Sequence, residues 1–134
     1  MAYEFNSLLG RLVGYRLYSV QFVADYVQLW FDNDPTRDVP VLTCDVLPTV
    51  ILGDRQVVPN QTGWTDALVA LIGQDVAATH EAIGAGVRLD LSIGSIQLRP
   101  TEKELVGPEI ATLSHFDDRA WMTWRPGEEA FEYL

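Results

Sequence analysis

The chain has 134 residues, of which 48% are hydrophobic and 21% are charged, a composition typical of one globular domain rather than of a disordered or fibrous chain. Nine basic and nineteen acidic residues give a formal net charge of −10 at pH 7, which disfavours nucleic acid and anionic lipid as partners. No apolar run reaches 18 residues, and the first residues lack the pattern of a secretory signal. We therefore expect a cytoplasmic protein with no membrane partner.

Cysteines and metal-binding motifs limit the chemistry that the chain can carry. The single cysteine, Cys44, excludes an intrachain disulfide, and its acidic neighbour favours a buried, unreactive thiol. Asp32, Asp34 and Asp38 have part of the spacing of a calcium loop, but Arg37 stands where that loop needs glycine. Nucleotide-binding glycine motifs and catalytic signatures are missing. The sequence predicts no catalytic residue, no metal and no cofactor.

Two segments about sixty residues apart share one pattern. Ser7–Phe31 and Thr65–Leu91 each start with a residue suited to an N-cap, continue through a short apolar run and reach a Leu-x-Gly step. Gly14 and Gly73 close these steps and can adopt the left-handed conformation that ends a helix. An alternating apolar strand follows each glycine. The pattern predicts an internal pseudo-repeat, about residues 7–58 and 65–133, within a single domain of residues 1–134.

Most of the remaining chain consists of short alternating or extended runs separated by turn residues. This organisation predicts an α+β domain that is β-rich, with mostly antiparallel sheets built from two related halves, each with a short helix. We expect strands at Tyr15–Val23, Tyr26–Phe31, Val39–Leu47, Thr49–Leu52, Arg55–Val58, Gln74–Ile83, Val87–Ile93, Ile96–Arg99, Ile110–His115, Ala120–Trp124 and Ala130–Tyr133.

The first repeat carries aromatic residues on the strand face that should meet water. Tyr26 and Trp30 occupy this face, Asp32 and Asp34 follow them, and the second repeat has charged or small residues at the equivalent positions. Large aromatics beside acids resemble the composition of a protein-binding patch. The alternative is that another element covers this face and makes it a second core layer.

The C-terminal segment poses a similar choice. Trp121 and Trp124 point to opposite faces of a regular strand, so one can be core while the other meets a partner. Glu128 and Glu129 follow closely, and aromatic anchors rimmed by carboxylates suit a basic protein. The predicted protein-binding residues are Tyr26, Trp30, Asp32, Asp34, Trp124, Glu128 and Glu129.

Two other functional hypotheses remain. His115 with Asp117 or Asp118 could form a general base in a pocket between the halves, which would make the chain a small-ligand-binding domain or an enzyme. A homodimer is the other hypothesis, with Trp30 or Trp124 filling a self-complementary interface.

The order of these units resembles a family of small bacterial domains of unknown function. The matching stretches are Leu12–Phe31, Leu71–Ile96 and Trp121–Phe131, which supply two Leu-x-Gly units and a closing Pro-Gly turn. The resemblance implies no catalytic residues and no cofactor, and some domains of this kind look like immunity proteins for polymorphic toxins. The leading expectation is a non-enzymatic interaction module, immunity-like, that binds a basic partner.

Overall fold

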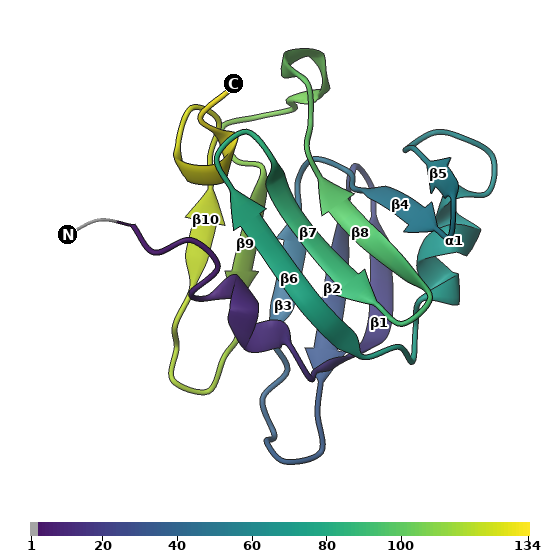
Figure 1. The fold of residues 1–134 in the computed structure, drawn as a ribbon, viewed down its shortest axis with the longest axis vertical. Coiled ribbons are helices and arrows are strands. Elements are labelled where there is room, and N and C mark those ends of the chain that lie inside the picture. Colours follow the sequence, from purple (N-terminus) through teal and green to yellow (C-terminus); the bar gives the residue numbers. More distant parts are fainter. Residues whose placement is uncertain (1–2) are drawn as a thin grey trace.

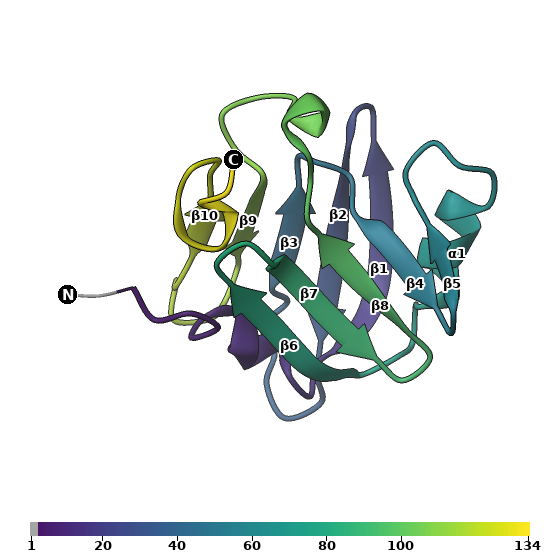
Figure 2. The same cartoon turned by 45° about the horizontal axis from the view of Figure 1, so that its top comes forward.

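The computed structural model describes residues 3–134 and has two antiparallel five-stranded sheets that lie one over the other (Figures 1 and 2). This arrangement confirms the predicted β-rich α+β class. Sheet A contains, in spatial order, β1 (Arg16–Val23), β2 (Tyr26–Asp32), β3 (Val41–Cys44), β9 (Ala111–Ser114) and β10 (Met122–Trp124). Sheet B contains, in spatial order, β5 (Arg55–Val57), β4 (Thr49–Leu52), β8 (Gly94–Leu98), β7 (Gly86–Leu91) and β6 (Val76–Ala82). The helical elements are α1 (Trp64–Ala70) and the 3-10 turns η1 (Leu9–Leu12), η2 (Glu102–Glu104) and η3 (Glu129–Phe131).

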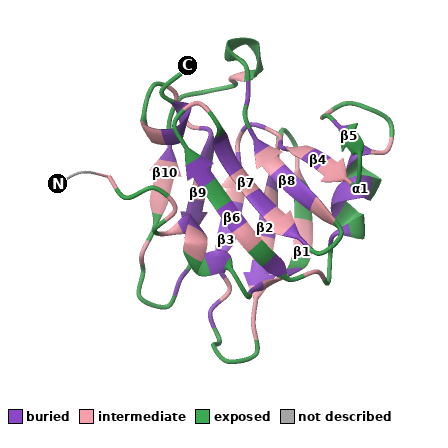
Figure 3. Cartoon of the chain, viewed as in Figure 1, coloured by how far each residue is buried: buried purple, intermediate pink, exposed green. Residues whose placement is uncertain are grey.

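The core lies between the sheets and is filled by the side chains of alternate strand residues (Figure 3). Every second residue of β2 is buried, namely Val27, Leu29 and Phe31, while the residues between them are half-buried. β7 repeats the pattern, and Leu68 of α1 is fully buried with them. Each fully buried side chain of this size contributes about 1.5–3 kcal/mol to folding. Burial on one face of each sheet therefore holds the two layers together.

The meander β1-β2-β3 of sheet A and the meander β6-β7-β8 of sheet B have matching registers. Trp30 pairs with Val41 across β2 and β3, and Asp90 pairs with Ser95 at the equivalent place across β7 and β8. A register shift interrupts β1 and β6 at the same point. After each meander the chain crosses over, so that β4 and β5 extend sheet B while β9 and β10 extend sheet A. The two meanders therefore share one register pattern.

The two Leu-x-Gly steps meet where the halves join. Gly14 and Gly73 have φ angles of 90° and 95°, in the left-handed region that their sequence pattern predicts. The Gly14 N–H donates to the carbonyl of Val76 at 2.9 Å, and the Gly73 N–H donates to the carbonyl of Leu17 at 2.7 Å. An isolated antiparallel bridge lies between these two bonds. Each glycine therefore ends a helical turn and links its half to the other.

Some local expectations are wrong. Ala130–Tyr133 is not a strand: Ala130 and Phe131 are consecutive and both fully buried, which a strand with one buried face cannot achieve and the helical turn η3 can. Ser7 and Thr65 cap no helix, because η1 starts after Leu8 and α1 starts after Gly63. No helix within residues 3–134 has the length and apolarity needed to cross a membrane.

Candidate functional site

Tyr26 and Trp30 lie on the outer face of sheet A, where both side chains are half-buried. Three helical elements have their main contacts elsewhere: α1 packs against β4, η1 against β6, and η3 against β6, β7 and β10. The side chains between and beside the two aromatics are neutral: the Gln28 amide donates to the Thr43 hydroxyl at 3.2 Å. The centre of the outer face of sheet A is therefore aromatic and uncharged.

Trp30 has an unusual polar environment on this face. Its ring lies 6.4 Å from the His115 ring, centroid to centroid, and its backbone pairs with Ser19 and Val41. Among the buried side-chain nitrogen and oxygen atoms of residues 3–134, only Trp30 Nε1 has no hydrogen-bond partner. An unsatisfied buried donor costs about 1–3 kcal/mol. This position is therefore not optimised for the stability of the isolated domain.

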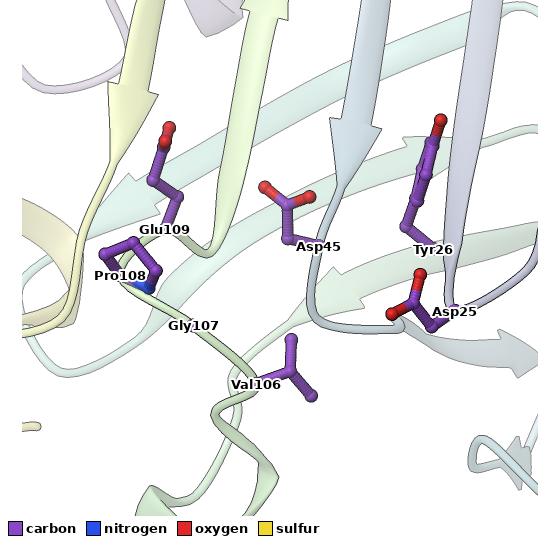
Figure 4. A pocket seen from close by; sticks show the side chains of 7 residues that line it. All are labelled: Asp25, Tyr26, Asp45, Val106, Gly107, Pro108 and Glu109. Atoms are coloured by element: carbon purple, nitrogen blue, oxygen red, sulfur yellow. The ribbon is translucent and has the colours of Figure 1, made fainter.

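The Tyr26 end of the same face opens into an acidic cavity of about 240 Å³ (Figure 4). Its three carboxylates come from separate connections: Asp25 from the β1–β2 turn, Asp45 from the end of β3, and Glu109 from the segment before β9. A second hollow of about 520 Å³ continues from it and shares Asp25, Asp45 and Val106. The lining of the first cavity is Asp25, Tyr26, Asp45, Val106, Gly107, Pro108 and Glu109.

Among residues 3–134 no ion pair neutralises these carboxylates, although Lys103 lines the adjoining hollow that shares Asp25 and Asp45. Burial raises the pKa of Asp45, and the negative charges of Glu109 and Asp25 raise it further. None of the three takes part in the ion pairs within 4.0 Å that residues 3–134 form, and no group of three His, Cys, Asp or Glu side chains in that range is arranged to hold a metal ion. The ion pairs are Arg11–Asp118, Arg16–Asp32, Arg16–Asp34, His80–Asp90 and Arg88–Asp90.

The predicted acids after β2 lie at the other end of the face and are partly neutralised. Arg16 Nη2 lies 3.0 Å from an Asp32 carboxylate oxygen and 3.9 Å from one of Asp34. Asp38, the third acid of the calcium-like spacing, is buried and accepts a hydrogen bond from the Tyr15 hydroxyl at 2.9 Å. The three aspartates therefore have different partners and do not surround a common point.

Trp124 is not a surface residue, which corrects its place among the predicted binding residues. Its side chain is fully buried, and its indole N–H donates to Glu81 at 2.8 Å. The register pairs Trp124 with Ala111, an inward-facing residue, and leaves Trp121 63% exposed. Glu128 precedes η3 and Glu129 is its first residue. Because η3 packs against β6, β7 and β10, the structure does not bring these glutamates together with Tyr26 and Trp30.

The hypothetical pairing of His115 with Asp117 or Asp118 does not form. His115 is exposed and bonds through Nδ1 to the Ser114 hydroxyl at 2.8 Å. Asp118 pairs with Arg11, and the backbone N–H of Asp117 donates to Asp38 at 3.4 Å. No hydrogen bond among the described residues joins His115 to either aspartate, and His115 lines none of the cavities described above.

Comparison with protein-family models, with curated proteins and with solved structures found no match. The site itself therefore carries the functional conclusion.

Sequence reasoning missed the acidic cavity. Asp25, Asp45 and Glu109 each lie beside a turn or strand end, and no local motif links them. Only the strand order could have done so, since pairing of β3 with β2 and β9 places all three at one end of sheet A. The adjacent Tyr26 is the one residue of the cavity that its sequence pattern singled out.

Proposed function

We propose that this chain is a non-enzymatic interaction module, immunity-like in kind, that binds a basic protein partner through the outer face of sheet A and the acidic cavity at its end. The observation that carries this proposal is the convergence of Asp25, Asp45 and Glu109 beside Tyr26 without a cation among them. Neighbouring carboxylates repel one another, so a cation supplied by a partner relieves a repulsion that is already present in the free protein.

The cavity suits one long basic side chain. A volume of about 240 Å³ is below the range of about 300–1,000 Å³ typical of drug-sized ligand sites. Val106 and Pro108 offer apolar contacts to the methylene stem of a lysine or arginine, while the carboxylates face its charged end. The aromatic, neutral surface around Trp30 supplies apolar area to the rest of the interface. The net charge of −10 adds long-range attraction for a basic partner.

The test is calorimetric titration of the protein with a lysine-rich peptide, at about 50 and 500 mM salt so that screening is weak and then strong. The double variant Asp45→Asn/Glu109→Gln removes two charges from the cavity. The matched control Asp54→Asn/Asp66→Asn removes two charges from exposed positions in the β4–β5 turn and on α1.

We expect the cavity variant to lower the affinity about tenfold, and the control to lower it no more than about twofold, because exposed distant charges act mainly through screened attraction. Equal losses in the two double variants would reduce the effect to net charge and overturn the cavity's role. Absence of binding at both salt concentrations would contradict the proposed function as a whole.

A further inference from the structure

A buried carboxylate that does not line the acidic cavity lies on the inner face of β6. Glu81 is 7% exposed and accepts hydrogen bonds from three donors: the Asn6 backbone N–H at 2.7 Å, the Trp124 indole N–H at 2.8 Å, and the Tyr3 hydroxyl. Two of these three donors belong to one short segment at the start of the chain. Glu81 therefore connects that segment to the sandwich.

This segment, Tyr3–Ser7, is called the N-terminal strap below, and polar bonds hold it in place. Besides its bond to Glu81, Asn6 exchanges two bonds with Thr79: its amide donates to the Thr79 carbonyl at 3.2 Å and accepts from the Thr79 hydroxyl at 2.8 Å. Phe5 is 37% exposed and packs edge-on against Tyr3 rather than in the core. The strap leads to η1 without joining either sheet (Figure 1).

The adjoining η1 is attached differently. Leu9 and Leu12 are fully buried in the core, so η1 is anchored by apolar packing. The change from polar to apolar attachment falls between Ser7 and Leu9. One bond crosses this boundary, from the Gly10 N–H to the Asn6 carbonyl at 2.8 Å, so motion of the strap breaks that bond and leaves the apolar anchors of η1 in place.

The other half of the molecule has an apolar contact where the strap has its polar one. Phe22 pairs with Val27 as Glu81 pairs with Val87, so the two residues occupy equivalent positions. Phe22 packs against Trp64 at the start of α1, with ring centroids 5.9 Å apart. Separating such an aromatic pair exposes apolar surface to water. Separating the strap from Glu81 instead returns a carboxylate to water, where it is well solvated.

We propose that the N-terminal strap is a lid that opens as a unit while the two sheets stay packed, with Glu81 as its latch. On opening, Glu81 keeps the Trp124 bond and gains water in place of Asn6 and Tyr3. A groove of about 280 Å³ between the strap and β10, lined in part by Leu8, Trp121 and Met122, then widens as far as Glu81. This inference is independent of the proposed function, because neither the strap nor Glu81 lines the acidic cavity.

The experiment follows hydrogen exchange of individual backbone amides by NMR. The Asn6 amide reports the latch directly, since Glu81 is its acceptor. The Leu29 and Leu42 amides, in the centre of sheet A, report opening of the sandwich. The variants are Glu81→Gln, which weakens the acceptor, Tyr3→Phe, which removes one donor, and the control Glu4→Gln, the same chemical change at an exposed strap residue.

We expect Asn6 to exchange faster than the sheet A amides in the unchanged protein. Glu81→Gln should speed Asn6 exchange about tenfold or more, because a hydrogen bond to a charged acceptor is stronger than one to a neutral amide. Tyr3→Phe should speed it less, and Glu4→Gln should leave it unchanged. The sheet A amides should keep their rates in Glu4→Gln. In Tyr3→Phe they should speed by no more than Asn6 does and stay slower than Asn6, because the lost bond stabilises the closed state against opening and unfolding alike.

Two results would overturn the lid. One is exchange of Asn6 at the same rate as the sheet A amides, which would mean that the strap opens only when the whole domain unfolds. The other is an unchanged Asn6 rate in both Glu81→Gln and Tyr3→Phe. If Glu81→Gln unfolds the domain, Tyr3→Phe alone decides, since it leaves Glu81 two of its three donors.

Discussion

The outer faces of the two sheets share a backbone register but differ in side-chain chemistry. On sheet B, Asp90 accepts hydrogen bonds from the Arg88 Nε–H at 2.7 Å and the Ser95 hydroxyl at 2.7 Å, and lies 2.8 Å from His80 Nε2. On sheet A, the equivalent residue is Trp30, whose indole N–H has no partner. The outer face of sheet B therefore carries a polar network whose members satisfy one another, whereas the outer face of sheet A carries an aromatic side chain with an unpaired, buried N–H.

The acids of the two sheets differ in the same way. Burial alone would raise the pKa of Asp90, but the hydrogen bonds from Arg88, Ser95 and His80 outweigh it and hold that pKa at about 2. Asp45, at the Tyr26 end of sheet A, experiences the opposite balance, since burial, Glu109 and Asp25 all raise its pKa. The charge of Asp90 on sheet B therefore stabilises the folded protein, whereas the charge of Asp45 beside sheet A destabilises it.

The largest expected effect comes from breaking the sheet B network. Asp90→Ala removes the shared acceptor of three side chains and leaves the Ser95 hydroxyl, which is nearly buried, without its partner. We expect the free energy of unfolding to fall by about 2 kcal/mol, the size implied by a pKa displaced by nearly two units. Urea unfolding of this variant at pH 7 measures the loss. A change below about 0.5 kcal/mol would show that the network is only a solvated surface.

The same comparison predicts opposite responses to acid. Because the folded pKa of Asp90 lies below its unfolded value of 3.8, its stabilisation is present above pH 3.8 and is lost as the pH falls toward 2. The folded pKa of Asp45 lies above 3.8, so its destabilisation is present at neutral pH and disappears as the pH falls. Unfolding curves of Asp90→Asn and Asp45→Asn between pH 7 and 2 test both signs. At low pH the free energy of unfolding of each variant should converge on that of the unchanged protein. It should approach from lower values for Asp90→Asn and from higher values for Asp45→Asn.

A smaller effect is expected at the acidic cavity. Asp45→Asn removes one of three mutually repelling charges and should stabilise the domain at pH 7 by up to about 1 kcal/mol, a modest gain because solvent screens much of the repulsion. Differential scanning calorimetry beside the control Asp54→Asn separates this local effect from the general benefit of lower net charge. A destabilised Asp45→Asn would mean that the carboxylate makes a stabilising bond in the free protein.

The smallest effect is expected at Trp30. Trp30→Phe removes the unpaired indole N–H together with some apolar area, so the two contributions oppose each other. The free energy of unfolding should change by less than about 1 kcal/mol, while binding of a partner that uses this face should weaken. Measuring both quantities for one variant separates a binding residue from a core residue. A large loss of stability would place Trp30 in the core, as the alternative from the sequence had it.

Local pattern predicted the parts of the molecule that depend on local conformation. Gly14 and Gly73 have the left-handed φ angles that their Leu-x-Gly steps indicate, and the alternation in β2 places Val27, Leu29 and Phe31 inside. The prediction for Trp124 was wrong because inward and outward positions in a three-residue strand depend on its pairing with β9. Sequence spacing carries no information about that pairing.

The candidate site depends on the same non-local pairing. Asp45 and Glu109 are separated by more than sixty residues in the chain, and the antiparallel pairing of β3 with β9 brings them to one cavity. The sequence pattern placed Tyr26 on the outward face of its strand. It did not show that Asp45 and Glu109 lie beside this tyrosine. The aromatic part of the surface could therefore be predicted, and the acidic part required the strand order.

The most direct test of the account maps where a basic ligand binds. Titration of the isotopically labelled protein with a lysine-rich peptide, followed by backbone amide shifts, covers both outer faces in one experiment. The account predicts shifts at Asp25, Tyr26, Asp45 and Glu109, with His80, Asp90 and Gln97 on sheet B unchanged. Shifts spread evenly over both sheets, or concentrated on sheet B, would contradict it.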